Sequence, residues 1–367
     1  MHSDGKGRVD LPHQTLPTQL GGCIDAAEVL THNEGNAATG GIWRVHGPTG
    51  SAILKVARPP TSEPVGSPAW QTSNEPTHWN YWQREVLAYT TGFAASVYAD
   101  AGIMAPALLE VAQRPDGAIE LWLADAQGAP GVSWPVPRLA HFARQLGTAQ
   151  ARWVDRVPDL PWLSRRWLAQ YLAHGPGRGV WISGDEHWNH PVAAAWPAIV
   201  RDQLRRLWAQ RDAILAVAEA TPRTVCHLDV WPTNLIEDGA TTVLVDWSFT
   251  GEGGIGEDIA NLIVDSVADG LMDAALLPDI TAAVTDEYIA GLHDGGWGGA
   301  PDTVRHAIAA NGAAKYRWFA PLALGRVIRD GTFGHPQYGR DTSGESALRR
   351  LQGLVTLLAD WAQATLC

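Results

Sequence analysis

The spacing of hydrophobic and polar positions changes along the chain near residue 128. Before that point, short alternating runs predict two pairs of strands, at 42–46 with 52–56 and at 108–112 with 119–124. Turn signals separate the members of each pair, for example Gly47-Pro-Thr-Gly50. Between the pairs, a segment rich in Pro, Ser and Thr predicts an exposed connector at 59–76. A helix is predicted at 79–99, where apolar residues recur at spacings of three and four.

Helical spacing dominates after residue 128. It predicts helices at 136–152, 160–174, 196–220, 257–267, 278–293, 301–328 and 346–363. The exception is 224–247, where two short strands, 225–227 and 243–245, flank a polar loop. The pattern predicts an α+β protein with two lobes, a small β-rich one over residues 1–127 and a larger, mostly helical one over 128–367.

Composition excludes several classes of function. There is no run of about 18 apolar residues, and the N-terminal MHSDGKGRVDLPHQ lacks the apolar core of a signal peptide. The net charge of −12 argues against nucleic acid, whose recognition usually begins with a basic patch. The three cysteines are scattered, which suits a reducing compartment. We therefore expect a cytoplasmic protein that binds neither membrane nor nucleic acid, and no obligate protein partner is evident.

The polar loop contains the candidate chemistry, His227-Leu-Asp229-Val-Trp-Pro-Thr-Asn234. Asp229 follows a short apolar strand, so we expect its carboxylate where the chain leaves the sheet. Asn234 follows across a Trp-Pro turn, and Asp246 ends the strand 243–245 at a spacing that fits a hairpin. Phosphoryl transfer requires a carboxylate near the attacking hydroxyl and oxygen ligands for a hard cation. These three side chains supply that set if the fold brings them together.

The segment resembles the catalytic region of the aminoglycoside phosphotransferase and choline kinase-like family, which shares the two-lobed protein-kinase architecture. The resemblance implies that Asp229 orients or deprotonates the substrate hydroxyl and that Asn234 and Asp246 hold Mg²⁺. His227 is expected to support the loop rather than act as a base. Asp258, in a stretch similar to the family's glycine-containing turn and Asp-Leu-Ala, is implied to brace the loop from behind.

The first lobe agrees with the resemblance. Lys55 lies in an apolar strand and matches the family's nucleotide-binding lysine, in a chain with only three lysines among 27 basic residues. Glu85, on the amphipathic helix, resembles the glutamate that pairs with that lysine. Gly35 and Asn36 belong to a small-residue loop that resembles the family's phosphate-covering turn. ATP is the implied nucleotide, with GTP possible.

The segment 121–128 resembles the hinge that meets adenine through backbone groups. Its candidate nucleotide contacts are Leu123 and Asp125. The family often has Glu before this Asp, and this chain has Ala124 instead. We therefore expect the hinge to contact adenine through its backbone groups rather than through its side chains.

Each of these residues also has a plainer interpretation. Asp229 and Asn234 are residue types that favour turns for local reasons. Lys55 could protect the edge of a sheet, and Asp258 could simply favour the N-terminal end of its helix. The glycines at 251–256 formally match a dinucleotide-binding GxGxxG, but no repeated strand–helix–strand pattern surrounds them.

The sequence predicts a phosphotransferase that moves the γ-phosphoryl of ATP to a hydroxyl of an aminoglycoside-like or other sugar-containing antibiotic or metabolite. A housekeeping choline, amino-alcohol or sugar kinase and a nucleoside-antibiotic kinase are the alternatives among enzymes. The alternative from another class is a nucleotide-binding pseudokinase, which the joint presence of Lys55, Asp229, Asn234 and Asp246 disfavours.

The substrate leaves few marks in the sequence. Many of the 18 tryptophans lie between residues 153 and 208, where packing is the first interpretation and an aromatic wall against a sugar or nucleoside ring the second. Asp185 and Glu186, beside Trp181 and Trp188, are candidates for meeting a cationic substrate. The acidic net charge suits such a substrate and equally serves solubility.

Overall fold

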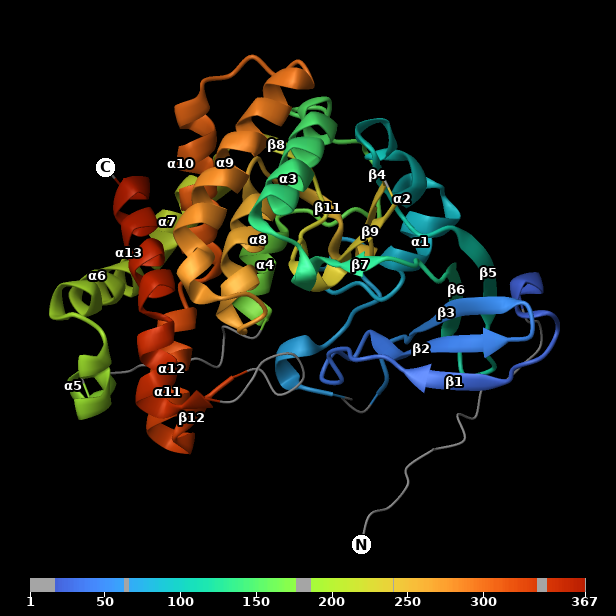
Figure 1. Ribbon diagram of the computed structural model, residues 1–367, viewed down its shortest axis with the longest axis horizontal. Coiled ribbons are helices and arrows are strands. Elements are labelled where there is room, and N and C mark those ends of the chain that lie inside the picture. Colours follow the sequence, from blue (N-terminus) through green and yellow to red (C-terminus); the bar gives the residue numbers. More distant parts are fainter. Residues whose placement is uncertain (1–16, 63–65, 176–185, 240, 335–341, 367) are drawn as a thin grey trace, which may run out of the picture.

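The described residues of the computed structural model, 17–62, 66–175, 186–239, 241–334 and 342–366, form two lobes (Figure 1). The smaller lobe contains a five-stranded sheet, and the larger lobe is mostly helical. This arrangement confirms the predicted α+β class with two lobes of unequal size.

The sheet of the small lobe is antiparallel throughout, in the order β1-β2-β3-β6-β5. Its strands are β1 (Ala26–Val29), β2 (Thr39–Gly47), β3 (Gly50–Ala57), β5 (Leu108–Gln113) and β6 (Ile119–Ala124). The four predicted strands are therefore present. The hydrophobic pattern did not predict β1, which is short and mostly exposed.

Side-chain alternation along β3 separates the two faces of this sheet. Leu54 and Val56 enter a small core that also contains Val45 and Trp122. Lys55 therefore points to the opposite face. Since β3 lies between β2 and β6, Lys55 sits in the middle of the sheet, and the edge-protection interpretation of this lysine is wrong.

The helix predicted at 79–99 is shorter and broken. The structure has α1 (Arg84–Thr90) and α2 (Phe93–Ser96), separated at Gly92, whose φ of 74° lies in the left-handed region. Arg84 accounts for the late start, because its fully buried guanidinium donates to the carbonyls of Pro76, His78 and Trp79 and curls the preceding chain. Burial lowers the pKa of Arg84 to about 9.

The helical lobe follows the predicted order with several helices divided. Its helices are α3 (Val136–Ala151), α4 (Trp167–His174), α5 (Glu186–Asn189), α6 (Ala198–Ala209), α7 (Arg211–Glu219), α8 (Glu257–Ala268), α9 (Leu277–Asp294), α10 (Pro301–Lys315), α11 (Phe319–Asp330), α12 (Gly344–Arg350) and α13 (Gln352–Leu366). The long helices predicted at 196–220, 301–328 and 346–363 are each two helices, and the one predicted at 160–174 begins only at residue 167.

Short strands join the lobes around the polar loop. They are β4 (Ile103–Met104), β7 (Ala129–Pro130), β8 (Arg223–Cys226), β9 (Leu235–Asp238), β10 (Thr241–Leu244) and β11 (Gly251–Gly254), with a separate pair, β12 (Thr332–Phe333) and β13 (Thr342–Ser343). β9 and β10 pair as a hairpin between Asn234 and Asp246, which is what the spacing of these residues predicted, while β8 pairs with β11. The lobe boundary at residue 128 stays a prediction, since β4 precedes it and pairs with β10.

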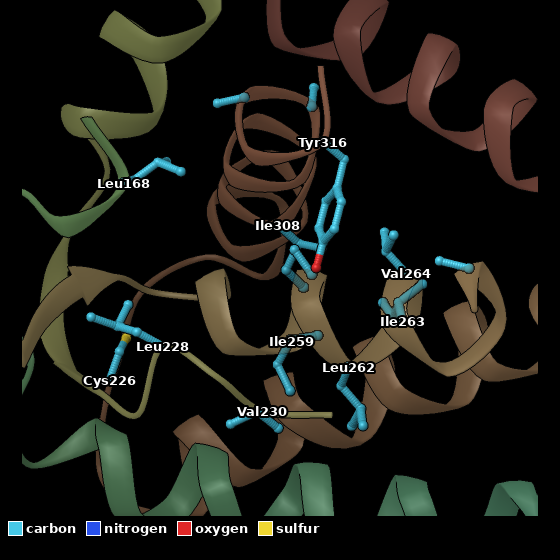
Figure 2. Packing of buried hydrophobic residues seen from close by; sticks show 14 of the residues in the cluster. Leu168, Cys226, Leu228, Val230, Ile259, Leu262, Ile263, Val264, Ile308 and Tyr316 are labelled. Atoms are coloured by element: carbon cyan, nitrogen blue, oxygen red, sulfur yellow. The ribbon is translucent and has the colours of Figure 1, made fainter. Parts of the chain in front are cut away.

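The core of the helical lobe extends up to the polar loop. Figure 2 shows Leu228 and Val230, from the loop, directed into the same interior as Ile259 and Leu262 of α8. All four side chains are almost completely buried. In the described part of the chain, no helix is long and apolar enough to cross a membrane.

Candidate active site

The polar loop presents Asp229 to a cavity by simple alternation. Leu228 and Val230 are buried in the core, so the side chain between them turns toward the space between the lobes, where Asp229 lines the cavity. Leu228 has a φ of 69°, a left-handed conformation that a branched residue adopts only when its surroundings impose it.

Asp258 supplies much of that constraint. Its Oδ2 accepts a hydrogen bond from the backbone N–H of His227 at 2.9 Å, and its Oδ1 accepts one from Leu228 at 2.7 Å. Gln150 donates to the same carboxylate at 2.8 Å, and Asn261 donates to the Leu228 carbonyl at 3.3 Å. Asp258 is completely buried. The first turn of α8 therefore holds the strained backbone in front of Asp229.

The glycines before α8 serve close packing. Gly256 precedes the helix with a φ of 78°, and a Cβ there would lie 2.4 Å from Cγ1 of Ile308 on α10. The approach of α10 explains the glycine. The dinucleotide-binding interpretation of 251–256 receives no support from the strands, because β11 runs antiparallel to β8.

Asp229 is tied to Asn234 across the turn. Nδ2 of Asn234 donates to the Asp229 carboxylate and to the Asp229 carbonyl, both at 2.9 Å. Burial, and then the charge of Asp246, raise the pKa of Asp229 to about 7. His227 lies behind the loop, with its ring centroid 5.0 Å from Trp247, and burial lowers its pKa to about 4. Its imidazole is therefore neutral at pH 7.

Lys55 joins the two lobes. Its Nζ lies 2.5 Å from Oε2 of Glu85 and 2.7 Å from Oδ1 of Asp246, and it reaches Ser248 at 3.2 Å. Burial alone would lower the pKa of Lys55, but the charges of Asp246 and Glu85 raise it above its usual value. Although burial opposes it, the charge of Lys55 lowers the pKa of Asp246. Lys55 and Asp246 are therefore both charged at pH 7.

Asp246 is brought beside Asn234 by the backbone. The N–H of Val245 donates to the Asn234 carbonyl at 3.0 Å, which extends the β9–β10 pairing to the start of the loop. Asp246 then takes a left-handed φ of 64°. The hydroxyl of Ser248 donates to its carboxylate. The predicted meeting of Asp229, Asn234 and Asp246 in one place is thus found, and the β9–β10 hairpin brings the last two together.

The loop expected to cover phosphates forms a tight turn. Asn36 lines the cavity, and its side-chain oxygen accepts hydrogen bonds from the Ala38 N–H at 3.1 Å and from Asn80 at 2.9 Å. Gly35 lies behind the lining, with its carbonyl accepting from the Ser67 N–H at 2.9 Å. The loop is therefore held in part from outside its own sequence, by the Asn80 side chain and the Ser67 backbone.

The hinge residues fall into two kinds. Leu123 lines the cavity. Asp125 also borders it, but its carboxylate accepts from Arg44 at 2.9 Å and Ser51 at 2.7 Å and is almost fully buried. A nucleotide contact from Asp125 would have to use its backbone, as the sequence suggested for this hinge.

These groups surround one cavity of about 420 Å³. Apolar side chains from both lobes line one part of it: Ile42, Ile53, Pro106, Leu123, Ile236 and Val245. Charged and amide groups line the centre: Lys55, Glu85, Asp229, Asn234 and Asp246. The lining also includes Trp70, Trp231, Phe249, Asp265 and Asp269, which the sequence did not single out.

The described tryptophans between residues 153 and 208 pack in the helical lobe and do not line the cavity, as the first of the two interpretations predicted. Trp162, Trp167, Trp188 and Trp196 are buried in the helical core, and the cavity lining contains no described residue of this range. The cavity's tryptophans instead come from the connector and the polar loop. Glu186 is exposed and does not border the cavity, while Asp185 and Trp181 lie outside the described residues.

Lys315 is a second buried lysine that the sequence analysis passed over. Its Nζ lies 4.9, 5.8 and 5.6 Å from the ring centroids of Trp167, Tyr171 and Tyr316. The hydroxyl of Tyr316 donates to Asp265, a lining residue of the cavity, at 2.6 Å. The rarity of lysine in this chain was the one sequence signal that could have pointed to it.

Glu257 predicts a pH-dependent stability. Burial raises its pKa from 4.5 to about 7, and the Gly254 N–H donates to its Oε2 at 2.9 Å. Because the folded pKa exceeds the unfolded one, its stabilising contribution is complete below pH 4.5 and is lost as the pH rises toward 7. We expect Glu257→Gln to gain about 1–3 kcal/mol relative to the wild type between pH 5 and pH 8. Thermal unfolding of both proteins at each pH measures this difference.

Glu75→Gln, at an exposed loop residue, is the matched control. Its stability should depend on pH in the same way as that of the wild type. Parallel pH dependence in the wild type and Glu257→Gln would show that Glu257 stays ionised in the folded protein.

Comparisons with known proteins agree with this site. Residues 186–300 match the model of the phosphotransferase enzyme family, and this segment contains the polar loop, Asp246 and Asp258. No curated protein matches the sequence. Among solved structures, an amicoumacin kinase in complex with AMP-PNP and Ca²⁺ is similar, with a TM-score of 0.50 and 13% identity. The match includes 90% of this chain and 87% of the kinase.

Two other structures are similar at lower scores. A choline/ethanolamine kinase family protein from Mesorhizobium loti has a TM-score of 0.48 and 15% identity over 92% of this chain and 93% of its own. An aminoglycoside 2'-phosphotransferase in its GDP complex has a TM-score of 0.47 and 12% identity over 84% and 88% of the two chains.

The resemblance predicted from the sequence is confirmed. The fold is protein-kinase-like, and residues 186–300 are similar to the phosphotransferase enzyme family.

Proposed function

We propose that this phosphotransferase moves the γ-phosphoryl group of ATP, or of GTP, to a hydroxyl of an aminoglycoside-like or other sugar-containing small molecule. The observation that carries the proposal is the contact of Lys55 with both Glu85 and Asp246, beside the hydrogen-bonded pair Asp229 and Asn234 in the same cavity. Phosphoryl transfer needs positioned charges and an oriented nucleophile rather than covalent help, and this arrangement provides both.

Each group has a distinct part in this proposal. Lys55, held between two carboxylates, binds the nucleotide phosphates and keeps Glu85 at the cavity wall. Asp229 orients the acceptor hydroxyl and takes its proton, for which a pKa of about 7 is well placed. Asp258 and His227 stay behind the loop, where Asp258 fixes the backbone before Asp229. The apolar part of the cavity, with Leu123 at the hinge, takes the nucleotide base.

Asn234 and Asp246 would hold Mg²⁺. The Asn234 amide donates through Nδ2, and Asp246 receives Lys55 and Ser248 on Oδ1, so Asn234 Oδ1 and Asp246 Oδ2 accept no hydrogen bond from the described residues. No group of three His, Cys, Asp or Glu side chains could hold a metal in the described residues. Two protein oxygens still suit Mg²⁺, which takes its remaining ligands from phosphates and water. When bound, the ion neutralises charge on the phosphates.

The acceptor end of the cavity favours a cationic molecule. Asp265 lies on α8 and Asp269 follows its last residue as the C-cap, one turn further on, and both line the cavity. Burial raises the pKa of each carboxyl to about 6, so both are largely ionised at pH 7.

A panel of acceptors tests the proposal. The purified protein is incubated with Mg²⁺ and ATP or GTP and, in turn, aminoglycosides, nucleoside antibiotics, neutral sugars, choline and amino alcohols. We expect nucleotide consumption and a phosphorylated product, identified by mass spectrometry and phosphorus NMR, with an amine-bearing sugar compound and not with choline.

Omitting Mg²⁺ should abolish product formation. Phosphorylation of choline in preference to every sugar-containing compound would overturn the acceptor assignment. Binding of nucleotide without transfer to any hydroxyl compound would overturn the proposed reaction.

A further inference from the structure

The described residues of the connector between β3 and α1 are exposed or half-buried, in line with the prediction of an exposed segment, but Trp70 lines the cavity. The connector forms a short helical turn, η2 (Pro68–Trp70), which lies between the small-lobe sheet and the helical lobe (Figure 1). Two backbone hydrogen bonds attach it to the loop expected to cover the phosphates. Ser67 N–H donates to the Gly35 carbonyl at 2.9 Å, and Ala37 N–H donates to the Trp70 carbonyl at 3.0 Å.

Asn80 makes the most connections in this segment. It is 2% exposed, and its amide Nδ2 lies 2.9 Å from Oδ1 of Asn36 and 3.2 Å from the carbonyls of both Trp70 and Gln71. In return, the Thr72 hydroxyl donates to the Asn80 carbonyl at 2.7 Å. One amide therefore links the nucleotide loop to the backbone that carries the Trp70 ring.

The same segment is anchored to the helical lobe. The N–H of Trp79 donates to Oε1 of Gln170 on α4 at 3.0 Å, and Nε2 of Gln170 donates to the Thr77 carbonyl at 3.0 Å. Arg84 binds the Ser248 carbonyl at 3.2 Å, next to the Asp246 turn. The segment 66–84 thus spans from the nucleotide loop to α4 and to the turn after Asp246.

Trp70 presents an aromatic surface at that end. Both Trp70 and Phe249 line the cavity, with ring centroids 6.3 Å apart and planes at 30°. Buried Trp79 supports both rings, at centroid distances of 5.4 Å from Trp70 and 5.9 Å from Phe249. Rings packed in this way hold a fixed orientation, because a rotation of one requires the others to move.

We propose that Trp70, supported by Phe249, is the wall of a subsite for the ring of the acceptor, and that Asn80 is the residue that positions it. The ligand class is a saturated sugar-type ring, whose C–H face lies on the indole while its amine reaches Asp265 or Asp269. The subsite rests on the proposed function, since it takes the acceptor of that reaction. Asn80 also holds Asn36 in the loop that covers the phosphates. A nucleotide that fixes this loop should therefore fix the Trp70 ring as well.

Steady-state kinetics test the wall, with the best sugar-containing acceptor of the panel as the probe. We expect Trp70→Ala to raise the KM for the acceptor about 10-fold or more, with the KM for ATP within about twofold of wild type. Trp70→Phe should recover most of the loss, because a phenyl ring keeps an aromatic face. Trp208→Ala, a half-buried tryptophan on α6 away from the cavity lining, is the matched control and should leave both constants unchanged.

Amide hydrogen exchange tests the role of Asn80, with AMP-PNP and Mg²⁺ as the only ligands. In the wild type, we expect the nucleotide to slow exchange in residues 66–75 as well as in the loop 33–39. In Asn80→Ala, the nucleotide should still slow exchange in the loop 33–39 but no longer in residues 66–75. Calorimetry should show that AMP-PNP still binds to this variant.

The outcomes separate the two proposals. A wild-type protein that phosphorylates no ring compound overturns the proposed function and the subsite together. Turnover of a sugar acceptor with an unchanged KM in Trp70→Ala overturns the subsite alone. Equal protection of 66–75 in the wild type and Asn80→Ala overturns the positioning role.

Discussion

Replacing Asp229 by Asn is expected to lower kcat by about 100- to 10,000-fold, because it removes the carboxylate that we propose as the acceptor of the hydroxyl proton. The amide can still accept a hydrogen bond from Asn234, so the loop should keep its shape. Lys55, Asp246 and the hinge are untouched, and affinity for AMP-PNP with Mg²⁺ should stay within about threefold. Turnover with the acceptor of the panel and calorimetric titration with AMP-PNP measure the two effects separately.

Asp238→Asn is the matched control, since Asp238 is an exposed residue at the end of β9, close in sequence to Asn234. It should leave kcat and nucleotide affinity unchanged. Turnover of Asp229→Asn within a few-fold of wild type would show that proton transfer to Asp229 is not part of the reaction. Asp229 would then be a residue that only stabilises the turn.

Asp258→Ala is expected to reduce the free energy of unfolding by about 3–5 kcal/mol. The substitution leaves two buried backbone N–H groups and the Gln150 amide without their acceptor. It also removes the constraint on Leu228, whose left-handed backbone should relax and move Asp229. Chemical denaturation measures the stability, and kcat should fall even in the fraction that is folded.

Asp279→Ala separates this role from the helix dipole. Asp279 is exposed in the first turn of α9, as Asp258 is buried in the first turn of α8, so both share the favourable interaction with a helix N-terminus. That interaction contributes about 0.3–1 kcal/mol. Equal losses in the two variants would mean that Asp258 acts through the dipole alone. Asp258→Asn, which keeps one acceptor oxygen, should fall between them.

The parts of the site that local sequence could predict share a property. Asp229 lies between two apolar residues, and Lys55 alternates with Leu54 and Val56, so the direction of each side chain follows from the burial of its neighbours. The period of the hydrophobic pattern also places the strands and most helices. Burial of apolar surface fixes these features, and it can be read from neighbouring residues.

The failed predictions depend on partners distant in sequence. The helix predicted from residue 79 begins at Arg84, because that side chain binds carbonyls in the chain before it and in the helical lobe. The composition of the connector predicted its exposure but not its attachment to the nucleotide loop, which Asn80 makes by donating to Asn36. No local pattern encodes a hydrogen bond between a buried amide and a loop 44 residues away.

The sequence by itself determined the two-lobed class and the resemblance to phosphotransferases, and it singled out the residues proposed to carry the reaction, because periodic burial and a short motif are local. Tertiary structure alone decided how they meet. It paired β8 with β11, placed Lys55 between Glu85 and Asp246, and brought Trp70 rather than a later tryptophan to the cavity. The physical reason is that ion pairs, strand pairing and aromatic packing depend on distance in space, which the order of residues along the chain does not give.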